Sequence, residues 1–487
     1  MQQKSLKANA FLNTFKMLFT LCFPLITFPY SSRILGPDNI GKVNFAQSIV
    51  SYFSMIAWLG ISGYATREAA KVRNDKAQLS KVVKEIFTIN LVSTAVSYCL
   101  LAVALFLVEK FAYYRELIII CASLIMFETL GLSWLYNAVE DYFYTTVRSI
   151  IFQVISMILL FVLVKAKDDY LQYAAINVIA NAGANICNLL HARKYISFKS
   201  VKKIEVKKHL KPIFVFFAAS VASTIFSQID TTMLGFISGD EEVGFYSTGF
   251  KIIRMIKDLF PAIYGVLFPR ISYYSAHHDA ESIRLLSEKT INAMLCFALP
   301  ITIGLILLMK PLVFLFCGEK YYASVLVAKV MAPYIIITAI SGFIGGTLCT
   351  AFGKEKIPLY VILFAAVFDV ILNSFLIPNY GAYGATLATL LTELAMLIIY
   401  AIYQRRLLKI LAVKQSAAQF LISTAVMGIA VYFVREIFQS LLSKLFIPTF
   451  IGILVYALML TILKNAFFIE NTRTIALKIK ERFNKIK

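Results

Sequence analysis

The sequence predicts an all-α polytopic membrane protein with about fourteen transmembrane helices. Three observations predict this class: 59% of the residues are hydrophobic, only 15% are charged, and the apolar residues form long runs separated by short gaps. The mean hydropathy of +0.75 lies outside the range of soluble globular chains. A β-barrel would show short alternating strands instead, so we expect helices throughout.

The expected helices follow one another with no gap longer than about 20 residues. The first apolar run, from about Phe11 to Ile34, is too long for the core of a signal peptide, so we expect it to remain as the first span. The last residues, Ile475 to Lys487, place apolar side chains at helical spacing between lysines, which predicts a helix on the inner membrane surface. The centres of the fourteen runs are Leu21, Ser54, Ala95, Leu124, Ile155, Val178, Ser223, Met255, Phe297, Ile337, Val367, Leu391, Val426 and Tyr456.

The basic residues collect in alternate gaps between the spans. The side that carries the N-terminus holds about 33 Lys and Arg and the opposite side about 10, and such a bias marks the cytoplasmic side. Both termini are therefore expected in the cytoplasm. The net charge of +21 indicates topology and attraction to anionic lipid. Nucleic-acid binding is not expected, because no soluble domain carries these charges.

The two halves of the chain correspond at an offset of 203 residues. Gly36 and Gly41 in the first outer turn match Gly239 and Gly244, and Arg67 matches Arg270. These matches predict a duplicated six-helix unit, with lobes at residues 1–200 and 201–410 around a central cavity. Residues 411–487 would then add two transmembrane helices and the basic amphipathic tail.

Cysteine and histidine usage gives no sign of a cofactor. The seven cysteines form no C-x-x-C pair and fall mostly within spans, so packed thiols are expected. The four histidines lie in or beside cytoplasmic gaps, where we expect solvated side chains rather than metal ligands. No metal, cofactor or catalytic constellation is predicted.

Charges inside the apolar runs are the best indication of function. Lys251, Arg254 and Asp258 share one face of the eighth span, and Lys257 flanks that face. Arg254 is expected about 15 Å below the outer end of its helix, where a basic residue costs at least ~3 kcal/mol against lipid. The cluster either lines a wet cavity or is neutralised by pairing with Asp258 or Asp230.

Span two carries no charge at the matching depth. A polar stripe occurs there instead, which predicts a neutral hydrogen-bonding wall opposite the basic one; its residues are Asn44, Gln47, Ser51 and Ser54. Four acids also lie within spans, and each is a candidate for H⁺ or Na⁺ coupling or for a structural hydrogen bond: Glu128, Asp230, Asp369 and Glu393.

Several of these motifs resemble the polysaccharide (O-antigen type) flippases, a family of the multidrug/oligosaccharidyl-lipid/polysaccharide exporter superfamily. The similar segments are Phe28–Pro37, Leu59-Gly60 with Arg67-Glu68, Asp230 with Met233-Leu234-Gly235, Phe268-Pro-Arg270, and Tyr380–Ala385. The resemblance covers about residues 8–410. It implies a central cationic cavity in a bacterial inner-membrane protein, with Arg33, Arg67 and Arg270 at basic positions of the motifs and Asp230 at the acidic one.

The sequence thus favours a monomeric, non-enzymatic flippase for polyprenyl-diphosphate-linked oligosaccharides that works by alternating access. Lys251, Arg254, Lys257 and Arg33 would bind the diphosphate, and Arg67 and Arg270 would guard the cytoplasmic mouth. A polysaccharide polymerase and assembly proteins are expected partners. The alternatives are an ion-coupled drug/cation antiporter, which would favour an acidic cavity, and a membrane polymerase or glycosyltransferase, which usually needs larger outer loops.

Overall fold

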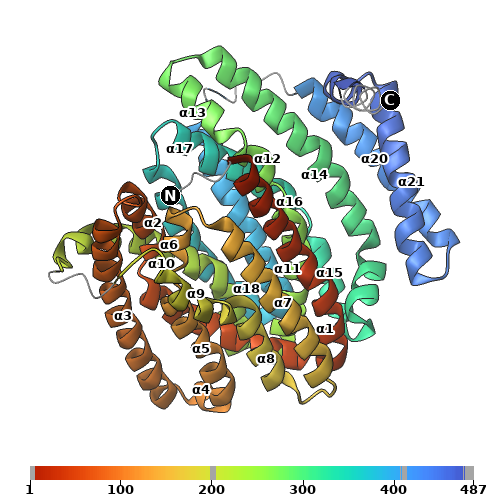
Figure 1. Cartoon of the computed structure of the whole chain (residues 1–487). Coiled ribbons are helices and arrows are strands. Elements are labelled where there is room, and N and C mark those ends of the chain that lie inside the picture. The colour runs from red at the N-terminus through yellow and green to blue at the C-terminus, as the bar shows by residue number, and fades with distance from the viewer. Residues whose placement is uncertain (1–5, 198–203, 406, 408–413, 475–476, 478–487) are drawn as a thin grey trace, which may run out of the picture. The chain divides into compact units, whose positions relative to one another are not determined.

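The computed structural model describes residues 6–197, 204–405, 407, 414–474 and 477, and this part of the chain contains helices and no strand (Figure 1). The predicted all-α fold is confirmed. The chain forms two compact units, residues 1–247 and residues 248–487. The lobes expected at residues 1–200 and 201–410, and the appended residues 411–487, stay a prediction. Apart from Leu477, the expected surface helix at residues 475–487 lies outside the described residues.

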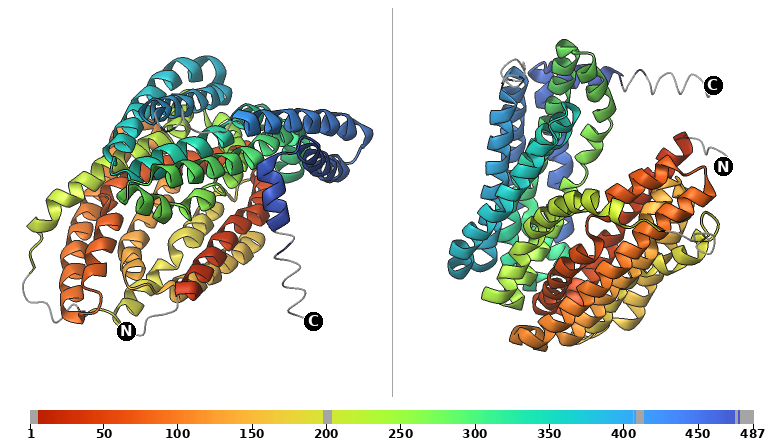
Figure 2. Two further views of the ribbon diagram at one scale, coloured as in Figure 1. Left: turned by 90° about the horizontal axis from the view of Figure 1, so that it is seen from above. Right: turned by 90° about the vertical axis from the view of Figure 1, so that its left-hand side faces the viewer.

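Unit 1, residues 1–247, is a bundle in which α1 packs against α3, α5, α7 and α10 (Figures 1 and 2). Its last helix, α11, continues across the boundary into the second unit. The helices are α1 (Leu6–Trp58), α2 (Ile61–Lys71), α3 (Lys76–Leu107), α4 (Glu109–Tyr113), α5 (Arg115–Gly131), α6 (Ser133–Ala138), α7 (Tyr142–Leu163), α8 (Tyr170–Val178), a π-helix (Ile179–Gly183), α9 (Asn185–Ala192), α10 (Lys207–Ile237) and α11 (Asp240–Lys257).

Unit 2, residues 248–487, places α14 against α15, α16 and the C-terminal pair α20 and α21 (Figure 1). Its helices are α12 (Pro261–Gly265), α13 (Phe268–Ala276), α14 (Ala280–Cys317), a 3₁₀ turn (Glu319–Tyr321), α15 (Tyr322–Met331), α16 (Tyr334–Ser341), a π-helix (Gly342–Leu348), α17 (Cys349–Ala351), α18 (Lys356–Tyr403), α20 (Lys414–Ile437) and α21 (Leu441–Ile462).

Ten helices of the described residues are long and apolar enough to cross a membrane. Two of them turn at a glycine with positive φ, Gly36 in α1 (75°) and Gly381 in α18 (52°), at the outer gaps that the sequence predicts. Only glycine adopts such angles at little cost, so each long helix is a pair of spans. Two further crossings are built from short pieces, α8 to α9 and α11 to α13. The chain therefore has about fourteen spans, as predicted.

The core of unit 1 lies where α2, α3, α6 and α10 meet, around Tyr64, Ile86, Trp134 and Tyr136, all at most 5% exposed. The outward face of α3 instead carries exposed apolar side chains at helical spacing: Val92, Val96, Leu100 and Val103. A helix with one packed face and one bare apolar face matches a bundle surrounded by acyl chains.

Candidate functional site

The basic residues predicted to carry function lie in the last turns of α11. Arg254 Nε lies 3.5 Å from Asp258 Oδ2, and Lys257 Nζ lies 3.2 Å from Asp258 Oδ1. The ion pair with Asp258 that the sequence allowed is therefore present. Two cations share this one carboxylate, and the side chain of Arg254 stays 63% exposed. Lys251 lies one turn before Arg254, and Glu393 of α18 is close enough to Lys257 to interact with it electrostatically.

The sequence of α11 explains where this helix starts and stops. Gly239 has a φ of 93° and ends the preceding turn, and three acidic residues then occupy the first turn of α11. Acids at the N-terminus and bases at the C-terminus both stabilise the helix dipole. Because α11 begins directly at Asp240, Arg254 lies about 21 Å along it, further than the 15 Å expected from the sequence.

Some side chains of the polar stripe in the second span already form hydrogen bonds within unit 1. Asn44 Nδ2 donates a hydrogen bond to Ser247 Oγ over 2.7 Å, and Ser51 Oγ donates to the carbonyl of Gln47 over 2.8 Å. The Ser54 hydroxyl is buried and has no hydrogen-bond partner among the described residues. The stripe is thus a half-buried polar face whose outer end is tied to α11.

Glycines that correspond at the 203-residue offset pack against each other's helices. A Cβ added to Gly41 would lie 2.7 Å from the carbonyl carbon of Asp240, and one added to Gly244 would lie 2.6 Å from that of Pro37. Pro37 and Asp240 are also 203 residues apart, as are Asn44 and Ser247. Reciprocal contacts of this kind are the pattern of a two-fold interface. The contacts thus join residues that correspond at the start of the two predicted repeats.

The three arginines of the resemblance come from three different helices. Arg67 in α2 is 57% exposed; its Nε lies 3.4 Å from Glu68, and its guanidinium lies 5.7 Å from the Tyr64 ring and 5.9 Å from the Phe216 ring. Arg33 in α1 and Arg270 in α13 are both exposed. Their roles in substrate binding stay predictions.

The four acids within spans have different surroundings. Tyr246 Oη donates to Asp230 over 2.6 Å, and Ser341 Oγ donates to Glu393 over 2.6 Å. Asp369 accepts hydrogen bonds from Thr392 Oγ1 at 3.0 Å and from Asn373 Nδ2 at 3.2 Å. Glu128 differs, because it lines a cavity of unit 1. Among the described residues, no group of three or more His, Cys, Asp or Glu could hold a metal ion.

Comparison with known proteins shows the family to which the chain belongs. Residues 6–275 match the family model described as "Polysaccharide biosynthesis protein". The chain belongs to this family. A curated relative from Shigella dysenteriae, named "Putative O-antigen transporter", is 23% identical over 364 residues, which are 74% of this chain and 90% of the relative.

Solved structures confirm the fold of this polysaccharide biosynthesis family member. The inward closed conformation of the lipid II flippase MurJ superposes with a TM-score of 0.75 at 17% identity, covering 92% of this chain and 98% of that one. An inward-facing multidrug resistance MATE family transporter of the MOP superfamily gives a TM-score of 0.63 at 14% identity, covering 80% and 95%. At such identities the likeness shows the fold alone.

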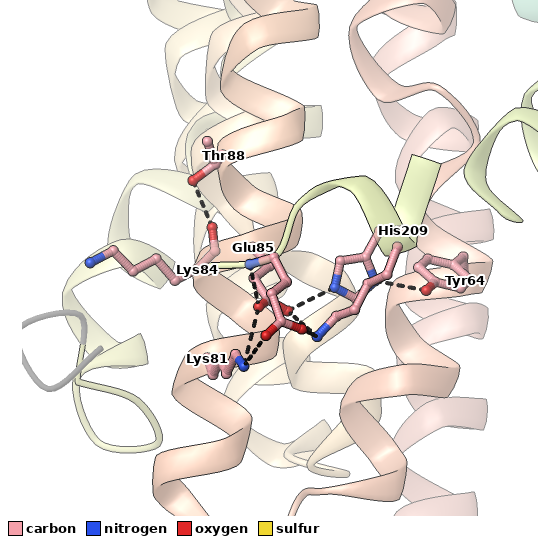
Figure 3. A network of polar contacts seen from close by, with 8 residues as sticks. Tyr64, Lys81, Lys84, Glu85, Thr88 and His209 are labelled. Carbon is pink, nitrogen blue, oxygen red and sulfur yellow. Dashed lines mark hydrogen bonds and ion pairs between the residues drawn. The ribbon is translucent and has the colours of Figure 1, made fainter. Parts of the chain in front are cut away.

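Sequence reasoning missed a buried polar network at the junction of α2, α3 and α10 (Figure 3). Tyr64 Oη lies 2.7 Å from His209 Nδ1, and His209 Nε2 lies 2.8 Å from Glu85 Oε2. Lys208 Nζ approaches the same carboxylate at 3.0 Å. His209 is only 3% exposed, so the expectation of a solvated histidine is wrong. The sequence around Glu85, with Ile86 and Ile89 buried beside it, did not indicate the network, because the partner His209 comes from a helix that is distant in the sequence.

A second residue that the sequence analysis passed over is Arg148 in α7, near the start of an apolar run. Its Nε and Nη1 atoms are shielded from solvent and have no hydrogen-bond partner among the described residues. Its position as a charge inside a span was the signal that could have found it.

Proposed function

We propose that this protein flips polyprenyl-diphosphate-linked oligosaccharides from the cytoplasmic to the outer leaflet of the bacterial inner membrane. Family membership and the name of the Shigella relative support a transporter of polysaccharide precursors, not an enzyme. The shared fold with a lipid II flippase supports a substrate made of a lipid tail and a polar head group.

The observation that carries the proposal is the cationic face of α11. A basic side chain within a membrane span is costly unless it faces water or a negative charge, and Asp258 neutralises only part of this face. A diphosphate supplies several acceptor oxygens, which the planar guanidinium of Arg254 binds in pairs and which Lys251 and Lys257 attract as point charges. The lipid tail stays in the bilayer while the head group crosses.

The finer features of the proposal follow from the charge pattern. Both termini lie in the cytoplasm, Arg67 and Arg270 guard the cytoplasmic mouth, and Arg33 assists in binding the diphosphate. Alternating access is driven by an H⁺ or Na⁺ gradient through one of the acids within the spans, of which Asp369 accepts hydrogen bonds from two side chains, those of Thr392 and Asn373. The protein acts as a monomer that passes its product to a polysaccharide polymerase and assembly proteins.

The test is complementation in cells that lack their own flippase and make the matching repeat unit. Arg254→Ala is expected to reduce surface polysaccharide at least tenfold and to make lipid-linked units accumulate, while Arg254→Lys retains part of the activity. Arg284→Ala is the matched control, because Arg284 in α14 is paired with Glu281 and Glu288 at 2.6 and 2.7 Å. Full export by Arg254→Ala contradicts the proposal. Resistance to cationic dyes conferred by the wild-type chain would favour a drug antiporter instead.

A further inference from the structure

Unit 1 contains a cavity of about 460 Å³ with a largely polar set of side chains. It is lined by residues of α1, α2, α3, α5, α6, α7, α9 and α10 and of the π-helix that precedes α9. Cavities of this size hold small organic ligands, and the few polar groups in them set the specificity. The volume suits one or two sugar rings rather than a long oligosaccharide.

Arg148 supplies positive charge to this cavity. Among the described residues its Nε and Nη1 atoms find no hydrogen-bond partner, although its guanidinium lies 5.7 Å from the ring of Tyr144. An aromatic ring eases the burial of a cation but accepts no strong hydrogen bond. The side chain also borders a neighbouring hollow that contains Phe143 and Val147 together with the polar groups of Asp141 and Tyr144. Nε and Nη1 make no hydrogen bond to these groups. A carboxylate or phosphate entering the cavity would meet donors that are already desolvated.

Further polar groups surround the same space. Gln153 Oε1 is buried without a hydrogen-bond partner among the described residues. Asn181 donates its amide hydrogen to the carbonyl of Asn177 at 2.8 Å, which leaves its side-chain oxygen as an acceptor. Glu128 also lines the cavity. These groups are acceptors for the hydroxyl groups of a sugar.

Both tryptophans of the chain, Trp58 and Trp134, line this cavity. Trp58 at the end of α1 is 38% exposed, while Trp134 in α6 is 5% exposed and belongs to the core of unit 1. A flat ring with one open face packs well against the C–H face of a pyranose, and its indole N–H seeks a polar partner. Trp58 is therefore the platform, and Trp134 closes the cavity behind it.

We propose that this cavity is a binding site for an acidic sugar, such as a uronic acid, in the head group of the lipid-linked substrate. The carboxylate binds Arg148, the ring stacks on Trp58, and Gln153, Asn181 and Glu128 accept its hydroxyls. This assignment rests on the proposed function and deepens it, because it names the class of sugar that the protein selects. It is separate from the cationic face of α11, which recognises the diphosphate shared by all such lipids.

The experiment uses the tryptophans as reporters, since no other tryptophan exists in the chain. Full-length protein in detergent micelles is titrated with glucuronate, glucose, acetate and inorganic phosphate while tryptophan emission is recorded. Glucuronate is expected to change the emission at a concentration at least tenfold lower than glucose, and acetate and phosphate are expected to be weaker than glucuronate. Arg148→Gln should remove the preference for glucuronate over glucose, and Arg148→Lys should restore part of it.

Each contrary result overturns a defined part of the inference. Equal responses to glucose and glucuronate contradict the role of Arg148, and equal responses to glucuronate, acetate and phosphate mean an anion site without sugar recognition. If neither sugar changes the tryptophan emission of the wild-type protein, and circular dichroism shows that the protein is folded, the site is refuted. Arg284→Ala should give the same titration curves as the wild type, because Arg284 is paired with Glu281 and Glu288 and does not line this cavity. If Arg254→Ala blocks polysaccharide export but the wild-type protein binds no sugar, the cavity inference fails and the proposed function stands. If the wild-type protein binds sugar but cells that lack it still export polysaccharide, the proposed function fails.

Discussion

The close approach of α1 and α11 makes a quantitative prediction about two glycines. In Gly244→Ala the new Cβ would lie 2.6 Å from the carbonyl carbon of Pro37, and in Gly41→Ala it would lie 2.7 Å from that of Asp240. Carbon atoms in good contact are about 3.5–4.0 Å apart, and the carbonyl oxygen of each residue is nearer to the new Cβ than its carbon, so the two helices must separate by more than about 1 Å. Overpacking of this kind costs typically ~1–3 kcal/mol, and here the obstacle is backbone that cannot rotate away.

The double variant distinguishes a shared contact from two separate ones. One separation of α1 from α11 relieves both clashes, so Gly41→Ala/Gly244→Ala should cost clearly less than the sum of the single variants. The two single variants should cost similar amounts, because their contacts are related by the 203-residue repeat. Gly304→Ala in α14 is the control, since nothing lies within 4 Å of its new Cβ. This control should be neutral or stabilising by ~0.5–1 kcal/mol.

Thermal unfolding in detergent, followed with a thiol-reactive dye, measures these differences. The buried thiols, which include Cys121 and Cys296, become reactive as the bundle opens. For a unit of this size ~2 kcal/mol corresponds to a fall of about 4–8 °C in the midpoint. A Gly244→Ala midpoint equal to that of the wild type would refute the close contact, and strictly additive single variants would refute the shared two-fold interface.

Two further predictions concern groups outside the α1–α11 contact. His209→Leu should destabilise the protein by ~1–3 kcal/mol, because Glu85 is fully buried and loses one of its hydrogen-bond partners. His277→Leu, at the exposed end of α13, is the control and should leave the stability unchanged. Equal unfolding midpoints for the two variants would contradict the network. Asp169 accepts hydrogen bonds from the backbone amides of Ala166 and Lys165, which lower its pKa below the ordinary value of 3.8. Its contribution is therefore present above pH 3.8 and lost as the pH falls through the lowered pKa, so Asp169→Asn should lower the midpoint at pH 7 and converge with the wild type in stronger acid; a constant difference down to pH 2 would contradict this assignment.

The sequence was sufficient for the fold because membrane spans are long and locally determined. Every span must satisfy its own backbone hydrogen bonds, so a run of apolar residues predicts a helix without knowledge of its neighbours. The turns at Gly36 and Gly381 were likewise visible, since each follows an apolar run and precedes another. The interrupted crossings were less visible, because the π-helix at Ile179–Gly183 keeps the composition of a continuous helix.

The candidate site was less accessible to sequence reasoning because its contacts join distant helices. The pairing of Arg254 with Asp258 was predictable, since four residues separate neighbours on one helix face. The contact of His209 with Glu85 spans 124 residues, and no local pattern records it. Arg148 illustrates a third case. Its place in a span was visible, but the lack of hydrogen-bond partners for Nε and Nη1 among the described residues depends on how the helices pack.

In the proposed function, the two positively charged features divide the task of recognising a lipid-linked sugar. Every substrate of this kind carries the same diphosphate, so a cationic face on α11 gives affinity without selecting among sugars. Selection requires groups that lose hydrogen bonds when the wrong sugar is present, and a half-buried guanidinium whose shielded Nε and Nη1 donors lack partners among the described residues would impose such a penalty. Substitutions on α11 should therefore lower the export of all substrates alike, whereas Arg148→Gln should lower it chiefly for substrates that carry an acidic sugar.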